Sequence, residues 1–181
     1  MRRLTDKRHR IQLVVPAVGH EEMFLKAVRR SQSLHGSWVS PPSTSAAYAR
    51  YLQRLRQPNQ VGYFVFDNSD QLVGVINISE IVRGAFCSAY LGYFALAPHA
   101  KRGYMTAGLA AALDRAFKVL KLHRVEANIQ PENIASVRLV KRLGFRREGH
   151  SPRYLKIAGR WRDHDRWALT AEEWNGHPIK P

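Results

Sequence analysis

The sequence predicts a single α/β domain of the α+β type, in which antiparallel strands carry helices on their faces. Three stretches predict this architecture. An apolar run over 90–96 precedes a glycine-containing turn and an amphipathic helix. Two strand-like runs, 60–67 and 71–81, flank the turn residues DNSD as the arms of a hairpin would. A later run, 124–130, alternates apolar and polar residues, which indicates a strand with two different faces.

The N-terminal elements follow from side-chain type and from helix start signals. Residues 11–15 are rich in β-branched side chains and predict the first strand. The run 21–31 begins with two glutamates and ends near two arginines, as the dipole of a helix favours. Glycine and two prolines within 34–44 predict an ordered loop and no helix. Ser43 or Thr44 can cap the helix that follows.

The C-terminal half continues with one long helix, one capped helix and several strands. The apolar spacing after the glycine turn predicts a helix over 105–121. Asn133 can cap a helix over 134–143, and Gly144 is a common stop signal. The other expected strands are 86–96, 146–148, 154–157 and 161–169. We therefore expect a basic arm over 1–10, one domain over 11–174 and a frayed tail over 175–181.

The composition indicates a basic protein whose surface attracts polyanions. The chain of 181 residues carries 29 Lys and Arg against 14 Asp and Glu, a formal charge of +15 with a pI near 10.6. Such a surface attracts nucleic acid, so association with RNA or the ribosome is one expectation. The single cysteine, Cys87, can form no internal disulfide, and no run reaches the ~18 apolar residues of a membrane span. We expect a cytoplasmic protein without a membrane partner.

The turn before the long helix has the features of an anion site. Gly103 can adopt backbone conformations that other residues resist, and Lys101 and Arg102 stand beside it. A helix start leaves unpaired N–H groups and a partial positive charge, which suit a phosphate or pyrophosphate. The same pattern also occurs as a plain connection between a strand and a helix, so both interpretations stay open on this stretch alone.

This turn resembles the acetyl-coenzyme A loop of the GCN5-related N-acetyltransferases, Q/R-x-x-G-x-G/A. The loop falls on residues 100–105, with Gly103 in its strict position, whereas Ala100 and Met105 depart from the family pattern. The segment NIASVRLVKRLGF is similar to the family's second motif, from Asn133 to the terminator Gly144. YLKIAGRWRDHDRWALT resembles the C-terminal signature of the branch that acetylates the N-terminal alanine of ribosomal proteins.

The resemblance implies a mixed, mostly antiparallel sheet that splays open to hold acetyl-coenzyme A. It implies that backbone groups of Phe94, Ala95 and Leu96 pair with the pantetheine arm as an added strand would. It also implies that Asn133 and Ser136 lie near the thioester. The amides expected to hold the pyrophosphate are those of Arg102, Gly103, Tyr104, Met105 and Thr106.

The implied reaction is direct attack of an amine on the thioester. Many relatives use a tyrosine as the acid at the position of Val140, and Ser136 is the substitute that the resembling branch offers. Ser136 could instead only support the helix. Glu126 can accept a proton as the base, or it can form a salt bridge with an arginine. Free α-amines are far more deprotonated at neutral pH than lysine side chains, so a site with an uncertain base suits an N-terminus.

Another cluster, Asp163, His164 and Asp165 between Trp161 and Trp167, could line the acceptor groove; with no histidine pair or cysteine nearby we expect no metal. The expected activity is acetyl transfer from acetyl-coenzyme A to a protein N-terminus, most simply the alanine of a ribosomal protein. Two alternatives remain: an acetyltransferase of a free small amine such as an antibiotic, polyamine or amino-acid conjugate, and a non-catalytic ribosome or RNA-binding factor. The chain could act as a monomer or a homodimer.

Overall fold

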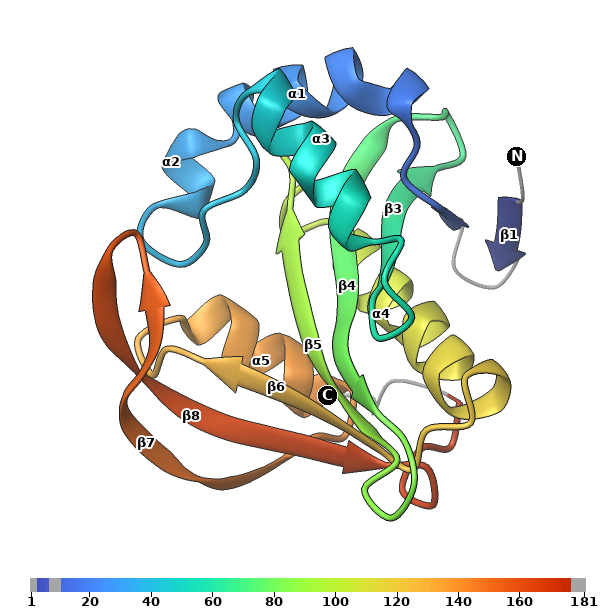
Figure 1. The fold of residues 1–181 in the computed structure, drawn as a ribbon, viewed down its shortest axis with the longest axis vertical. Coiled ribbons are helices and arrows are strands. Elements are labelled where there is room, and N and C mark those ends of the chain that lie inside the picture. Colours follow the sequence, from blue (N-terminus) through green and yellow to red (C-terminus); the bar gives the residue numbers. More distant parts are fainter. Residues whose placement is uncertain (1–2, 7–10, 177–181) are drawn as a thin grey trace.

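The structure, a computed structural model, describes residues 3–6 and 11–176, and its core is one eight-stranded sheet. The strand order is β1-β2-β3-β4-β5-β6-β8-β7, and every neighbouring pair is antiparallel except β5 with β6. The sheet runs through the middle of Figure 1 and bends strongly at its β7 end. The strands are β1 (Arg3–Asp6), β2 (Ile11–Val14), β3 (Val61–Asp67), β4 (Leu72–Val82), β5 (Ser88–Ala95), β6 (Arg124–Ile129), β7 (Arg146–Ile157) and β8 (Arg160–Thr170).

The single parallel pairing, between β5 and β6, is also the shortest contact between long strands. β5 pairs with β4 over most of its length, and β6 pairs with β8 throughout. β5 and β6 themselves share three rungs, which are Ser88 with Arg124, Ala89 with Val125 and Tyr90 with Glu126. Beyond these rungs the two strands diverge, which opens the sheet in its middle (Figure 1).

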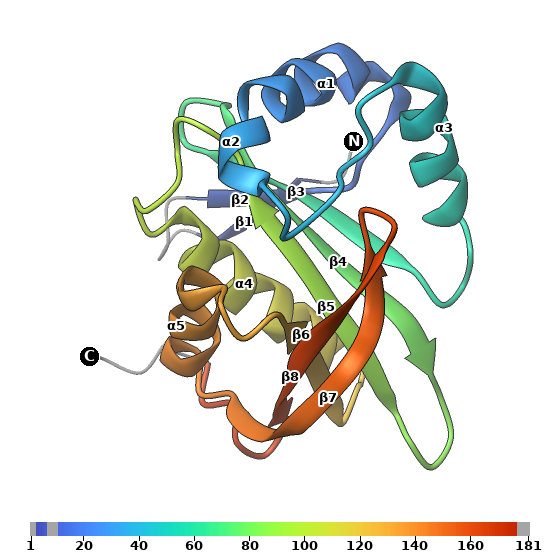
Figure 2. The ribbon, with the colours of Figure 1, turned by 90° about the vertical axis from the view of Figure 1, so that its left-hand side faces the viewer.

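Helices cover both faces of the sheet (Figure 2). On one face lie α1, α2 and α3, and aromatic and aliphatic side chains of α1 and α3 pack with Phe64 and Leu96. The other face carries α4 and α5, and α4 ends in a π-helical turn over Arg115–Val119. The helices are α1 (Glu21–Arg30), α2 (Gln32–His35), α3 (Ser45–Arg54), α4 (Tyr104–Asp114) and α5 (Ile134–Arg142), with a 3-10 turn at Val18–His20.

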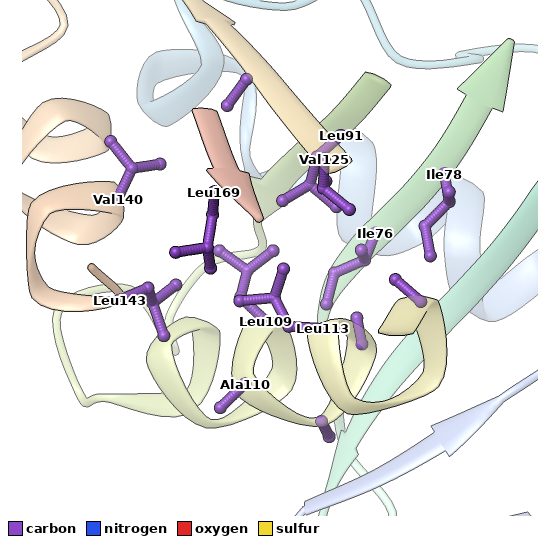
Figure 3. Close-up of a cluster of buried hydrophobic side chains, with 14 of the residues drawn as sticks. Ile76, Ile78, Leu91, Leu109, Ala110, Leu113, Val125, Val140, Leu143 and Leu169 are labelled. Carbon is purple, nitrogen blue, oxygen red and sulfur yellow. The ribbon is translucent and has the colours of Figure 1, made fainter. Parts of the chain in front are cut away.

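Helix α4 forms the centre of the larger core, shown in Figure 3. All residues from 107 to 113 are buried, so this helix is apolar on every side, as expected for one enclosed by other elements. Leu109 and Leu113 meet Ile76 and Ile78 of β4, and α5 adds Val140 from the other side. Gly108 lets the helix approach closely, because a Cβ built there would lie 3.0 Å and 3.1 Å from the two methyls of Val65.

The predicted fold class and most predicted elements are confirmed. Thr44 caps α3 by accepting the Ala47 N–H at 3.2 Å, and Asn133 caps α5. Three details differ. The expected loop over 34–44 begins inside the short helix α2; the two strands expected within 146–157 are one strand with register shifts; and 3–6, expected as part of an arm, pair with β2.

The remainder of the predicted arm, 1–2 and 7–10, and most of the predicted tail, 177–181, lie outside the described residues. Across the part of the chain that is described, no helix has the length and apolar character needed to cross a membrane.

Replacing Gly108 with valine is expected to destabilise the protein. The added carbons have no space between α4 and Val65, and overpacking of this kind costs about 1–3 kcal/mol. Thermal unfolding followed by circular dichroism measures the change. Gly19→Val is the matched control, since nothing lies within 4 Å of a Cβ built at Gly19. Equal melting temperatures for the two variants would contradict the close approach of α4 to the sheet.

Candidate functional site

The open edge of β5 carries backbone groups that β6 does not pair. The Leu96 N–H donates to Val73 O of β4 at 2.9 Å. Because backbone groups alternate in direction along an antiparallel strand, Phe94 also faces β4, whereas Tyr93 and Ala95 face the opening. Of the three residues expected to pair with a pantetheine arm, Ala95 therefore has its backbone groups on the open edge, whereas those of Phe94 and Leu96 face β4. Tyr93 also has its backbone groups on the open edge.

Helix α2 and the residues after it span this opening from β5 to β6. The His35 ring donates from Nε2 to Ala95 O at 2.9 Å, and burial lowers the pKa of His35, which favours the neutral ring. On the other side, Gln130 Nε2 donates to Ser37 O at 3.2 Å. These two bonds tie both sides of the opening to one short segment. The sequence gives no local signal for this bridge, because its partners lie 60 and 93 residues apart.

The start of α4 has the backbone geometry of an anion site. Gly103 has a φ of +84°, and nothing lies within 4 Å of a Cβ built on it. The first-turn N–H groups of the eleven-residue helix point back toward this open space, and Lys101 and Arg102 are exposed beside it. This arrangement fits a pyrophosphate, and the assignment of the amides of 102–106 to that group stays a prediction.

Met105, which departs from the small residue of the family motif, fills space that a glycine leaves on β4. A Cβ built on Gly74 would lie 2.2 Å from Met105 Sδ, so the thioether occupies the place of a side chain there. The long side chain thus points into the sheet and leaves the turn itself unobstructed.

The start of α5 brings a hydroxyl pair to the opening. Asn133 Oδ1 accepts the Ser136 N–H at 3.2 Å, so it caps the helix as predicted. Ser136 Oγ lies 2.6 Å from the Tyr93 hydroxyl, which reaches across from β5. Burial raises the pKa of Tyr93, although the hydrogen bond with Ser136 opposes that shift. Sequence reasoning missed Tyr93, whose only available signal was its position on the predicted strand.

Glu126, the candidate base, lies at the closed end of the opening, on the last rung that β5 and β6 share. Arg124 Nε donates to its carboxylate at 2.8 Å, and the same guanidinium also binds Glu148. Glu126 and Ser136 are thus on different parts of the opening. The geometry supports the alternative that Glu126 forms a salt bridge.

A cavity of about 450 Å³ adjoins the start of α5. It lies between the segment after α2, the end of β6 and the β7–β8 hairpin. At the edge of the cavity, Trp161 is 61% exposed, and Asp163 accepts the Arg153 N–H at 2.8 Å. The cavity is lined by Ser37, Trp38, Gln130, Glu132, Trp161, Arg162 and Asp163.

The remaining members of the predicted C-terminal cluster have structural contacts. Asp165 accepts hydrogen bonds from Arg147 and, at 3.0 Å, from His150 Nδ1, and the Arg147 guanidinium lowers the pKa of Asp165. Trp167 is buried, with the Lys141 ammonium 5.5 Å from its ring centre. His164 is buried too, and its Nδ1 lies 2.9 Å from Arg162 O. Of this cluster, Trp161 and Asp163 reach the cavity.

Comparison with known proteins agrees with this geometry. The family model described as an acetyltransferase (GNAT) domain matches residues 10–146. The chain is 38% identical over 120 residues to the Bacillus subtilis protein described as "Probable N-acetyltransferase YjcK", covering 66% of each. It is 37% identical over 135 residues to the Escherichia coli [Ribosomal protein uS5]-alanine N-acetyltransferase, covering 74% of this chain and 70% of that one.

A solved structure shares both the fold and part of the sequence. Mycobacterium smegmatis RimJ in complex with CoA-disulfide superposes with a TM-score of 0.82 at 28% identity. The match covers 90% of this chain and 83% of that chain. The open edge of β5 and the start of α4 therefore lie in a fold that has been seen with a coenzyme A derivative.

Gly103→Glu is expected to lower the affinity for coenzyme A at least about tenfold, since a carboxylate would stand where the anion binds and the φ of +84° disfavours a side chain. Isothermal titration with coenzyme A measures the affinity. Gly84→Glu makes the same change at a glycine with φ +69° and open surroundings, in the β4–β5 connection, and should bind normally. Unchanged affinity in Gly103→Glu would remove this turn from the coenzyme site.

Proposed function

Because the chain belongs to the GNAT acetyltransferases and resembles their RimJ-like branch, we propose that it acetylates the α-amine of a protein N-terminus, in particular an N-terminal alanine of a ribosomal protein. The observation that carries this proposal is the cavity beside the start of α5. Its volume of about 450 Å³ can take the end of a peptide, it has Trp38 and Trp161 among its walls, and it lies next to the helix that holds Ser136.

The two sides of the opening have different tasks in this proposal. On the coenzyme side, the backbone edge of Tyr93 and Ala95 pairs with the pantetheine arm, and the amides of 102–106 hold the pyrophosphate. On the acceptor side, the peptide end enters through the cavity. Asn133 fixes the start of α5, so that Ser136 lies near the thioester and donates to the sulfur that leaves.

The acceptor amine needs no strong base in this scheme. An α-amine with a pKa of about 8 is roughly one-tenth deprotonated at neutral pH, whereas a lysine of about 10.4 is less than one-thousandth deprotonated. Glu126 is held by Arg124 at 2.8 Å, so the proposal assigns it to the ion pair that closes the narrow end of the opening. Water next to the cavity accepts the proton that the amine loses.

The side chains at the tip of the β7–β8 hairpin favour a partner that contains RNA. The segment 152–162 has four basic residues and no carboxylate, and it exposes Leu155 and Trp161. Lys156 and Arg160 are both exposed. Basic side chains with an exposed aromatic ring suit phosphates and unstacked bases, so this tip can hold the cavity close to a protein that emerges from ribosomal RNA.

Acetyl transfer to matched peptides tests the acceptor class. One peptide carries a free N-terminal alanine, a second is blocked at its terminus and carries an internal lysine, and spermidine is the third acceptor. We expect mass spectrometry to find acetylation of the free terminus alone, because it is the most deprotonated of the amines at pH 7. Modification of the blocked peptide, or of spermidine alone, would contradict the N-terminal proposal.

Reversing charge at the hairpin tip tests the partner. Lys156→Glu with Arg160→Glu should weaken binding to small ribosomal subunits at least about tenfold and flatten its salt dependence. Acetylation of the free peptide should stay within about twofold. The matched control is Arg50→Glu in α3 with Arg56→Glu just after that helix, because both arginines are exposed away from the hairpin. Subunit binding equal to wild type in the tip variant would reject the hairpin as the docking site.

A further inference from the structure

We propose that Tyr93 is a positioning residue for Ser136: its hydroxyl donates to Ser136 Oγ and leaves the serine proton to point at the thioester sulfur. This inference rests on the proposed function of Ser136. The two oxygens lie 2.6 Å apart, which is a short distance for two neutral hydroxyls. They come from β5 and α5, 43 residues apart, so the contact also joins the two sides of the opening.

The surroundings decide which hydroxyl donates. A phenol is a stronger acid than an aliphatic alcohol and is therefore the better donor of the pair. Burial raises the pKa of Tyr93, so the phenol keeps its proton over the physiological range. The backbone N–H of Ser136 is fixed by Asn133 at 3.2 Å, which holds the serine Cα in place. With its oxygen accepting from Tyr93, the serine hydroxyl has its own proton left for a third partner.

The position of Tyr93 places this pair at the reacting bond. Its backbone lies on the open edge of β5 beside Ala95, where the pantetheine arm is proposed to pair. Its ring packs against the core under α4 and α5, so the hydroxyl has little freedom to leave Ser136. No other side-chain hydrogen bond of Tyr93 is present among the described residues, which leaves the serine as its partner in the structure.

The role of Tyr93 follows from where bonds, charge and protons move during acetyl transfer. The amine nitrogen forms a bond to the carbonyl carbon, the carbon–sulfur bond breaks, and the electron pair leaves with sulfur. The nitrogen loses one proton to water, and sulfur gains one. The Ser136 hydroxyl gives its proton to the sulfur as the charge there develops and takes one back from water, and Tyr93 stabilises the partial negative charge that this transfer leaves on Oγ. Tyr93 itself ends the step with its proton.

Tyr93→Phe keeps the ring and removes the hydroxyl. We expect kcat for the N-terminal peptide to fall about tenfold, the value of one hydrogen bond of about 1.4 kcal/mol, with KM for acetyl-coenzyme A within about twofold. Tyr51→Phe is the matched control, because it removes a buried tyrosine hydrogen bond of 2.9 Å to Asn77 on the other face of the sheet.

The double variant separates this inference from the function it rests on. If Tyr93 acts through Ser136, Tyr93→Phe on top of Ser136→Ala should cause no further loss of kcat. Multiplied losses in the double variant, or a normal kcat in Tyr93→Phe beside an impaired Ser136→Ala, would overturn the role of Tyr93 alone. A normal kcat in Ser136→Ala would remove Ser136 from catalysis and this inference with it.

Discussion

β5 and β6 stop pairing after three rungs, and the missing hydrogen bonds between them determine how the rest of the structure is arranged. Their ladder stops at Tyr90 and Glu126, and a buried backbone group without a partner is costly. The chain satisfies part of the exposed edge itself, through His35 on the Ala95 carbonyl. The remaining edge is available to a ligand that can pair as a strand does. Acetyl-coenzyme A, with the amides of its pantetheine arm, has that property.

Close packing around α4 holds this opening in shape. The helix lies deep in the core, and glycines at 74 and 108 give space to Met105 and to the approach of the helix backbone. Such an enclosed helix keeps its N-terminus at a fixed place relative to the end of β5. The candidate anion site and the open edge are therefore parts of one packed unit, while the proposed acceptor cavity is formed largely by the hairpin and the segment after α2.

Periodicity and capping signals in the sequence were sufficient for most elements, whereas the coenzyme turn that the family motif indicates stays a prediction. The caps Thr44 and Asn133 could be predicted because a cap bonds to a residue only three positions along the chain. The bridge through His35 and the contact between Tyr93 and Ser136 could not be predicted, since they join distant segments and depend on how the sheet opens. Glu126 was ambiguous for another reason: a carboxylate on a strand face can act as a base or pair with an arginine, and the side-chain geometry of Arg124, two residues away, decides for the ion pair.

Amide hydrogen exchange read residue by residue by NMR tests the central claim, that the open edge of β5 and the start of α4 together bind acetyl-coenzyme A. Adding coenzyme A should slow exchange at the amide of Ala95 and at those of 102–106 at least about tenfold, with little change on β7. Saturating binding that leaves Ala95 and 102–106 unprotected would place the coenzyme elsewhere and contradict the account.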